Sequence, residues 1–140
     1  MIIDETDNAD YFLYKFNISK KDQKRIKILD NFYKNKINSK TFTEDNLNKV
    51  FYYKGKQAVI DILNYRRIKS KKIDKHLEEL TKSYEIKSIP IMQINADSLM
   101  KKYKIPEGKI LGDKLKIIEE EWVQNNFNIS DQQVDRIINN

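Results

Sequence analysis

A run of apolar residues with helical spacing near the C-terminus constrains the fold of this chain more than any other feature. Leu111, Leu115, Ile118 and Trp122 follow one another at intervals of four, three and four residues. These intervals match the 3.6 residues of an α-helical turn, so the four side chains share one face of a helix. The sequence therefore predicts a helix that buries this face against a core.

Other residues of the same segment add details to this helix. Pro106 suits its first position, because the N–H that proline lacks needs no partner there. Gly112 lies beside the apolar face. Because glycine is unfavourable inside a helix, its presence predicts that another backbone packs closely against the helix at this position. We also expect three further apolar residues to widen the face, namely Ile110, Ile117 and Val123.

The remainder of the chain also favours short helices. Residues suited to cap a helix N-terminus precede four apolar segments, at Ser19, Thr43, Asn95 and Ser130. One of these helices is expected to end near Gly55. The clearest helical spacing in the first half of the chain is at Ile73, Leu77, Leu80 and Tyr84.

The content of turn residues argues against a sheet, since the chain has only three glycines and two prolines. Residues 88–94 are apolar but include Pro90, and we expect them to form an extended linker across the core. The sequence predicts an all-α fold, a compact multi-helix domain of about seven short helices with no sheet. We expect a poorly ordered N-terminus or truncated helix at 1–18, a helical body at 19–87 and a helical tail at 88–140.

Composition excludes several classes of protein. The chain has no cysteine, which rules out disulfides, thiolate zinc sites and a cysteine nucleophile. It has no apolar run near the roughly 20 residues that span a bilayer, and its acidic N-terminus is unlike a secretory signal. We therefore expect a soluble, cytoplasmic protein.

The C-terminal third of the sequence carries a family resemblance. Its elements are the segment Pro90–Met100, then Ile105-Pro106-x-Gly108, Gly112-x-x-Leu115, Glu119-x-x-Trp122 and Phe127. Together they resemble the C-terminal signature of bacterial tRNA nucleotidyltransferases and poly(A) polymerases. The resemblance implies an all-helical body and tail, which in that family grip tRNA while CCA or adenylate is added.

The catalytic features of such enzymes are not found in the sequence. Nucleotidyl transfer needs paired carboxylates that hold two divalent metals and a glycine-serine turn that cradles triphosphate. The chain has no Gly-Ser pair and no Asp-x-Asp or Asp-x-Glu after a strand pattern. We expect no catalytic residue, cofactor or metal ligand here, with the family's Mg²⁺ and nucleotide sites in a head and neck that this chain lacks.

Two weaker candidates for chemistry have simpler explanations. Glu119, Glu120 and Glu121 point about 100° apart on a helix and do not converge on one metal. His76 is the only histidine and is expected at the surface.

Two basic clusters are the candidate binding residues in a chain of net charge +6. We call them the 66–72 cluster, with Arg66, Arg67, Lys69, Lys71 and Lys72, and the 101–109 cluster, with Lys101, Lys102, Lys104 and Lys109. Charge alone leaves open whether they form a functional face or a solvated lysine-rich surface. With the resemblance, we expect them to contact the phosphates of tRNA.

A second interpretation stays open. The aromatic-rich segment Tyr11–Phe16 is suited to a protein–protein contact. The chain would then be a helical module that docks on a separately encoded head and neck protein, or a gene remnant without a function.

Overall fold

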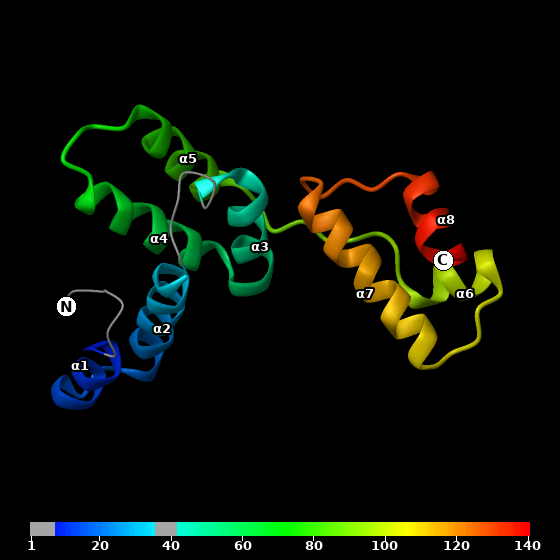
Figure 1. The fold of residues 1–140 in the computed structure, drawn as a ribbon, viewed down its shortest axis with the longest axis horizontal. Helices are drawn as coiled ribbons and strands as arrows, with labels where there is room; N and C mark the ends of the chain where they lie inside the picture. Colours follow the sequence, from blue (N-terminus) through cyan, green and yellow to red (C-terminus); the bar gives the residue numbers. More distant parts are fainter. Residues whose placement is uncertain (1–7, 36–41) are drawn as a thin grey trace. The chain divides into compact units, whose positions relative to one another are not determined.

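The computed structural model describes residues 8–35 and 42–140, which form eight α-helices and no strand (Figure 1). The all-α prediction is confirmed, with one helix more than expected. Residues 1–7 of the predicted N-terminal segment lie outside the described residues. The helices are α1 (Asn8–Phe16), α2 (Lys20–Lys34), α3 (Glu44–Lys54), α4 (Lys56–Lys69), α5 (Lys75–Ile86), α6 (Ala96–Tyr103), α7 (Lys109–Gln124) and α8 (Asp131–Asn139).

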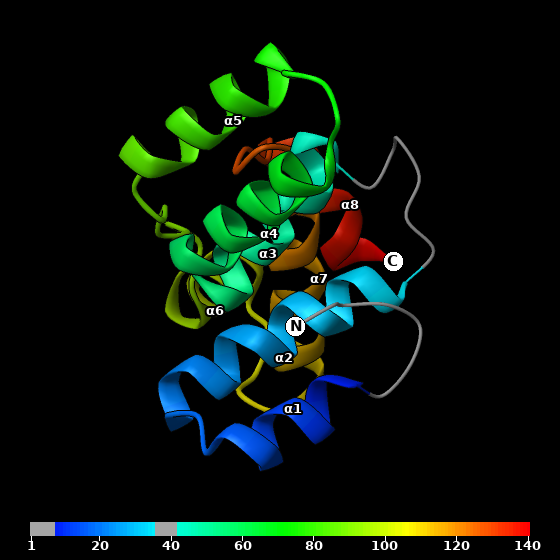
Figure 2. The ribbon, with the colours of Figure 1, turned by 90° about the vertical axis from the view of Figure 1, so that its left-hand side faces the viewer.

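The chain divides into two compact units. The first holds α1, α2, the end of α3, α4 and α5, and the second holds the start of α3 with α6, α7 and α8. In the first unit α4 packs against both α5 and α2, and α1 packs against α2 (Figure 2). Its buried apolar side chains are Leu13, Phe51, Ala58, Val59, Ile62, Leu63, Leu77, Leu80 and Tyr84.

The helix ends of the first unit follow local sequence signals. Ser19 caps α2 by accepting a hydrogen bond from the Asp22 N–H, as predicted. Gly55 ends α3 and begins α4 with a φ of 93°, a backbone conformation that favours glycine. Thr43 occupies the N-cap position of α3. These positions confirm the expected boundaries.

The expectation for Ile73 is wrong. Asp74 is the N-cap of α5, and its carboxylate accepts hydrogen bonds from the N–H groups of His76 and Leu77. Ile73 therefore precedes the helix and is 91% exposed, whereas Leu77 lies inside the helix and is buried.

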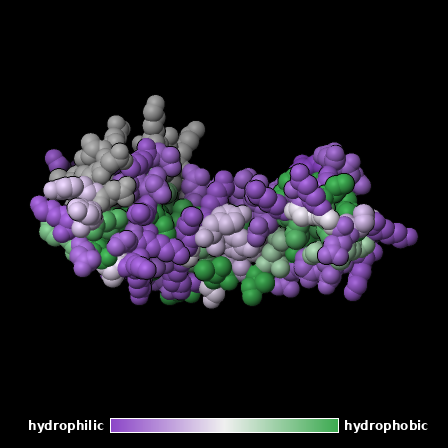
Figure 3. Space-filling model, turned by 90° about the horizontal axis from the view of Figure 1, so that it is seen from below, coloured by the Kyte–Doolittle hydropathy of each residue, from purple (hydrophilic) through white to green (hydrophobic). Residues whose placement is uncertain are grey.

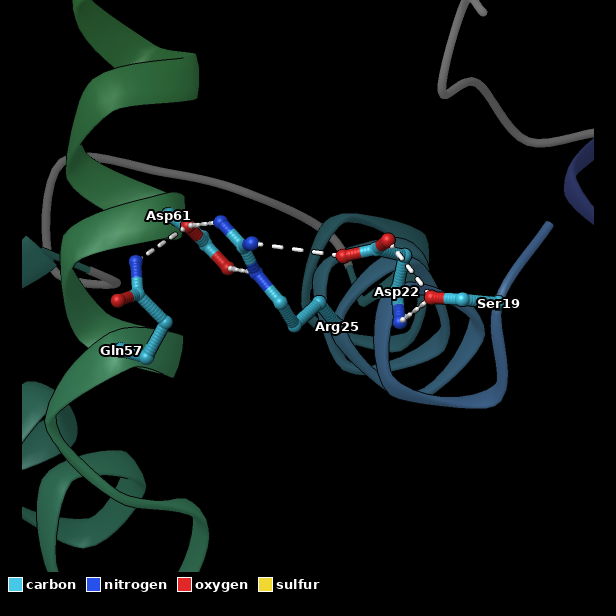
Figure 4. Close-up of polar contacts among 5 residues, drawn as sticks. All are labelled: Ser19, Asp22, Arg25, Gln57 and Asp61. Carbon is cyan, nitrogen blue, oxygen red and sulfur yellow. Dashed lines mark hydrogen bonds and ion pairs between the residues drawn. The ribbon is translucent and has the colours of Figure 1, made fainter.

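A polar cluster joins α2 to α4 (Figure 4). Arg25 donates two hydrogen bonds to the carboxylate of Asp61, at 2.9 Å and 2.8 Å. Gln57 donates a third, at 3.0 Å, and Arg25 also lies 3.6 Å from Asp22. Burial alone would raise the pKa of Asp61, but the hydrogen bonds and the charge of Arg25 bring that pKa below its ordinary value.

The second unit has its own core. Leu99 of α6, Leu111 and Ile118 of α7, and Val134 and Ile137 of α8 form one buried apolar cluster. The extended segment before α6 adds Met92 and Ile94, in agreement with the predicted linker across the core. Trp122 is 6% exposed, and its ring meets that of Phe127 edge to face at 5.1 Å.

Asn95 and Ser130, both predicted to cap a helix in the second unit, each form a capping box. The Asn95 side chain accepts from the Ser98 N–H at 2.9 Å, and the Ser98 hydroxyl accepts from the Asn95 N–H at 3.1 Å. Ser130 and Gln133 make the equivalent pair at the start of α8. Each box satisfies helix donors that have no partner inside the helix.

Several details predicted for α7 are wrong. The helix begins at Lys109, so Pro106 precedes it. Ile110 and Ile117 are 67% and 46% exposed, although Val123 is fully buried. No atom lies near the place where Gly112 would carry a Cβ. The apolar face of α7 is therefore narrower than expected. The prediction that another backbone packs closely against Gly112 is also wrong.

Replacing Trp122 by alanine is expected to lower the free energy of unfolding by about 3–5 kcal/mol, because a large buried aromatic leaves a cavity. Urea denaturation followed by circular dichroism measures this change. Ile110→Ala, an exposed position on the same helix, is the control and should cost under about 0.5 kcal/mol. Equal losses from the two substitutions would contradict the described core.

The Arg25–Asp61 pair is expected to couple by about 0.5–1 kcal/mol in a double-mutant cycle at neutral pH. Because the folded pKa of Asp61 lies below its ordinary value of 3.8, this stabilisation is present above 3.8 and is lost as the pH falls through the folded pKa. The exposed pair Lys116–Glu120, 4.0 Å apart, is the control. A coupling between Arg25 and Asp61 that does not depend on pH would refute this account.

Candidate functional site

The 66–72 cluster lies where α4 ends and the turn to α5 begins. Arg66, Arg67 and Lys69 belong to the last turn of α4, and Lys71 and Lys72 follow it. All five side chains are exposed. The Ser70 hydroxyl donates a hydrogen bond to the Lys72 carbonyl at 2.9 Å and stabilises the turn after α4. Lys71 and Lys72 lie in this turn, next to the end of the helix.

Two cations of this cluster rest on aromatic rings. The guanidinium of Arg66 lies 5.0 Å from the centre of the Phe42 ring, and the ammonium of Lys69 lies 5.7 Å from the centre of the Tyr65 ring. Both distances are in the range of cation–π attraction. These contacts restrict the two side chains while their charges stay in contact with water.

The other three cations line a hollow of about 540 Å³, which we call the α4–α5 hollow. Beside Arg67, Lys71 and Lys72, its walls contain apolar, polar and acidic side chains. They are Asn64, Ile68, Ser70, Ile73, Asp74 and Glu78. The 66–72 cluster is thus a concave surface in part, which the sequence pattern alone does not indicate.

The 101–109 cluster lies in the second unit, between α6 and α7. Lys101 and Lys102 belong to the last turn of α6. Lys104 ends that helix with a left-handed φ of 54°, and Lys109 is the first residue of α7. All four side chains are exposed. Since Gly108, the N-cap residue, has no side chain, the N–H groups of the first turn of α7 have no side-chain cap.

One lysine of the 101–109 cluster differs from the others. The ammonium of Lys102 lies 3.3 Å from the Asp131 carboxylate and 3.9 Å from that of Asp135. The Tyr103 hydroxyl donates a hydrogen bond to Asp135. Hydrogen bonds with Tyr103 and then Asp131 raise the pKa of Lys102. Lys102 therefore helps to join α6 to α8, and its charge is partly compensated.

The nine cations are evident from the sequence, but the residues that surround them are not. Ile73, which the helical spacing places in the core, lines the α4–α5 hollow together with Ile68. The sequence signal for them is that Ile68 lies between Arg67 and Lys69 and that Ile73 directly follows Lys72. Figure 3 shows one face of the molecule, which is mostly hydrophilic with several separate hydrophobic patches.

The weaker candidates lie at the surface or in ordinary ion pairs. His76 is exposed, Lys116 lies 4.0 Å from Glu120, and Glu121 accepts hydrogen bonds from Gln133 and Arg136. Within residues 8–35 and 42–140, no group of three or more histidine, cysteine, aspartate or glutamate side chains is arranged to hold a metal ion. In the same part of the chain, no helix is long and apolar enough to cross a membrane.

A protein-family model matches nearly the whole chain. The model described as tRNA nucleotidyltransferase domain 2 matches residues 1–134. Neither the comparison with curated proteins nor that with solved structures gave a match.

Proposed function

Because the chain belongs to the tRNA nucleotidyltransferase domain 2 family, we propose that it binds tRNA through the phosphate backbone as the helical body and tail of such an enzyme. The proposed setting is the cytoplasm, during addition of CCA or of adenylate to RNA. The nine cations of the two clusters are the proposed contacts.

The observation that carries this proposal is the position of both clusters at helix ends in a member of this family. Each cluster projects exposed ammonium or guanidinium groups from the last turn of a helix and the loop that follows. Phosphate contacts of this kind release counterions, and they depend on charge and shape and not on base identity. RNA helices are recognised mainly in that way.

The contacts of the nine cations indicate which of them are the stronger candidates for binding phosphate. Arg67, Lys71 and Lys72 surround a hollow and are the strongest candidates in the first unit. In the second unit Lys101, Lys104 and Lys109 are favoured over Lys102, whose charge is shared with Asp131. The uncapped start of α7 supports anion binding there, since a helix N-terminus carries a partial positive charge.

A second candidate function rests on α1. Tyr11, Tyr14 and Phe16 are 64%, 88% and 58% exposed, and Lys15 lies 5.7 Å from the ring centres of both Tyr11 and Phe16. Exposed aromatic residues are enriched where proteins associate. A separately encoded head and neck protein would bind there, and Tyr11→Ala with Phe16→Ala would weaken an association that depends little on salt.

Binding of tRNA is expected to weaken steeply with salt. The logarithm of the binding constant should fall by about 0.7–0.9 per log unit of salt for each phosphate neutralised. Replacing Arg67, Lys71 and Lys72 together by glutamine should make the slope shallower by about 0.7–0.9 for each of the three cations that contacts a phosphate. Fluorescence anisotropy of labelled tRNA at several salt concentrations measures the slope.

The matched control replaces Lys20, Lys21 and Lys24, which are exposed on α2, by glutamine. This variant loses the same charge outside both clusters, so its slope should change much less. Heparin serves as a generic polyanion. If both triple variants change the slope equally, or if tRNA binds no more tightly than a scrambled RNA of equal length, the proposed contacts are wrong.

A further inference from the structure

The α4–α5 hollow combines two properties that its role as a phosphate contact does not explain. Ile68 and Ile73 line it and are 81% and 91% exposed. Arg67, Lys71 and Lys72 line the same hollow. Two large apolar side chains are therefore presented to solvent among three cations, whereas phosphate binding by itself needs only the cations.

The positions of the two isoleucines follow from the helices on either side. Ile68 belongs to the last turn of α4, beyond the buried residues Ile62 and Leu63. Ile73 directly precedes Asp74, the N-cap of α5. The end of α4 and the loop that follows it thus place two isoleucines and two lysines around one concave surface.

The size of the hollow suits a small organic ligand. Its volume of about 540 Å³ lies within the roughly 300–1,000 Å³ of typical ligand sites. A nucleotide consists of a flat base with apolar faces, a sugar and an anionic phosphate. Isoleucine side chains can cover the face of a base, while arginine and lysine bind the phosphate.

We propose that the α4–α5 hollow holds one unpaired nucleotide of the bound RNA. The base lies against Ile68 and Ile73, and the adjoining phosphates contact Arg67, Lys71 and Lys72. This inference rests on the RNA-binding function proposed above and adds to it, since it makes single-stranded nucleotides part of what is recognised. RNA-binding proteins commonly take up bases splayed out from loops and bulges.

The two carboxylates of the hollow are compatible with this ligand. Asp74 is engaged in capping α5, at 3.0 Å from the His76 N–H, and Glu78 lies 3.2 Å from the ammonium of Lys82. The three cations of the hollow outnumber them. Carboxylates also accept hydrogen bonds from exocyclic amino groups of bases, so a base that carries an amino group, such as cytosine, is the appropriate probe.

Charge complementarity favours RNA over a peptide as the occupant. Every nucleotide brings a flat apolar surface and a negative charge together at a fixed separation, which matches isoleucines set among cations. A peptide would need acidic and apolar residues in one particular order to do the same. We therefore assign the hollow to RNA and make peptide binding an outcome of the test.

The experiment compares two RNA hairpins that differ by one unpaired cytidine in the stem. The wild-type chain should bind the bulged hairpin more tightly than the paired one. Ile68→Ser with Ile73→Ser should weaken binding of the bulged hairpin by about tenfold, which corresponds to about 1.4 kcal/mol, and should leave the paired hairpin and the salt slope unchanged.

The matched control is Ile86→Ser. Ile86 is 85% exposed in the same unit and does not line the hollow, so this variant should bind both hairpins as the wild type does. Circular dichroism and thermal melting verify that each variant is folded. A bulge with 2-aminopurine gives a direct readout, since its fluorescence should change on binding to the wild type and much less on binding to the double variant.

The outcomes separate this inference from the function on which it rests. If the wild type binds both hairpins equally and the isoleucine variant has no effect, the nucleotide site is wrong while RNA binding stands. If neither hairpin nor tRNA binds above the scrambled control, RNA binding itself is refuted. If an acidic, leucine-containing peptide binds through Ile68 and Ile73 and neither hairpin depends on them, the hollow belongs to a protein partner and the proposal is overturned.

Discussion

A helix of fewer than about 15 residues is only marginally stable in water unless it buries an apolar face. This constraint governs both units, because α1 of the first unit has nine residues and α6 of the second has eight. Each helix must place its apolar residues against a neighbour, as α4 does with α2 and α5. One face of each helix is thereby committed to packing, and both basic clusters occur where a helix ends and its loop begins.

The parts of the fold that could be predicted from sequence are those encoded within a few residues. The capping boxes at Asn95 and Ser130 are such signals, because donor and acceptor lie three positions apart. For the same reason the apolar spacing predicts the face of α7 that carries the buried residues Leu111, Ile118 and Trp122, although Leu115 on that face is only half-buried. Pro106 and Ile73 were expected inside helices, but each precedes its helix. Helical spacing alone does not show at which residue a helix begins, so it cannot tell whether the first apolar residue of a pattern belongs to the helix. Ile110 and Ile117 are apolar yet exposed, since the neighbours of α7 cover a narrower arc than its apolar residues span.

The candidate site was predictable in charge but not in shape. All nine cations could be read from the sequence, and the family match over residues 1–134 confirms the resemblance drawn from the C-terminal signature. The partners of the cations are distant in sequence: Lys102 meets Asp131, and Arg66 meets Phe42. Ile68 joins Ile73 in one hollow only because α4 and α5 pack side by side. Such relations depend on the tertiary fold, and no local pattern contains them.

The rings beneath Arg66 and Lys69 affect how an anion would be bound. A long cationic side chain loses up to about 2 kcal/mol of rotamer entropy when it is immobilised. Because Phe42 and Tyr65 already restrict these two side chains, part of that entropy is lost when the chain folds. Any anion that reaches the end of α4 therefore meets two cations that are already oriented, and their ordering adds little to the free energy of association.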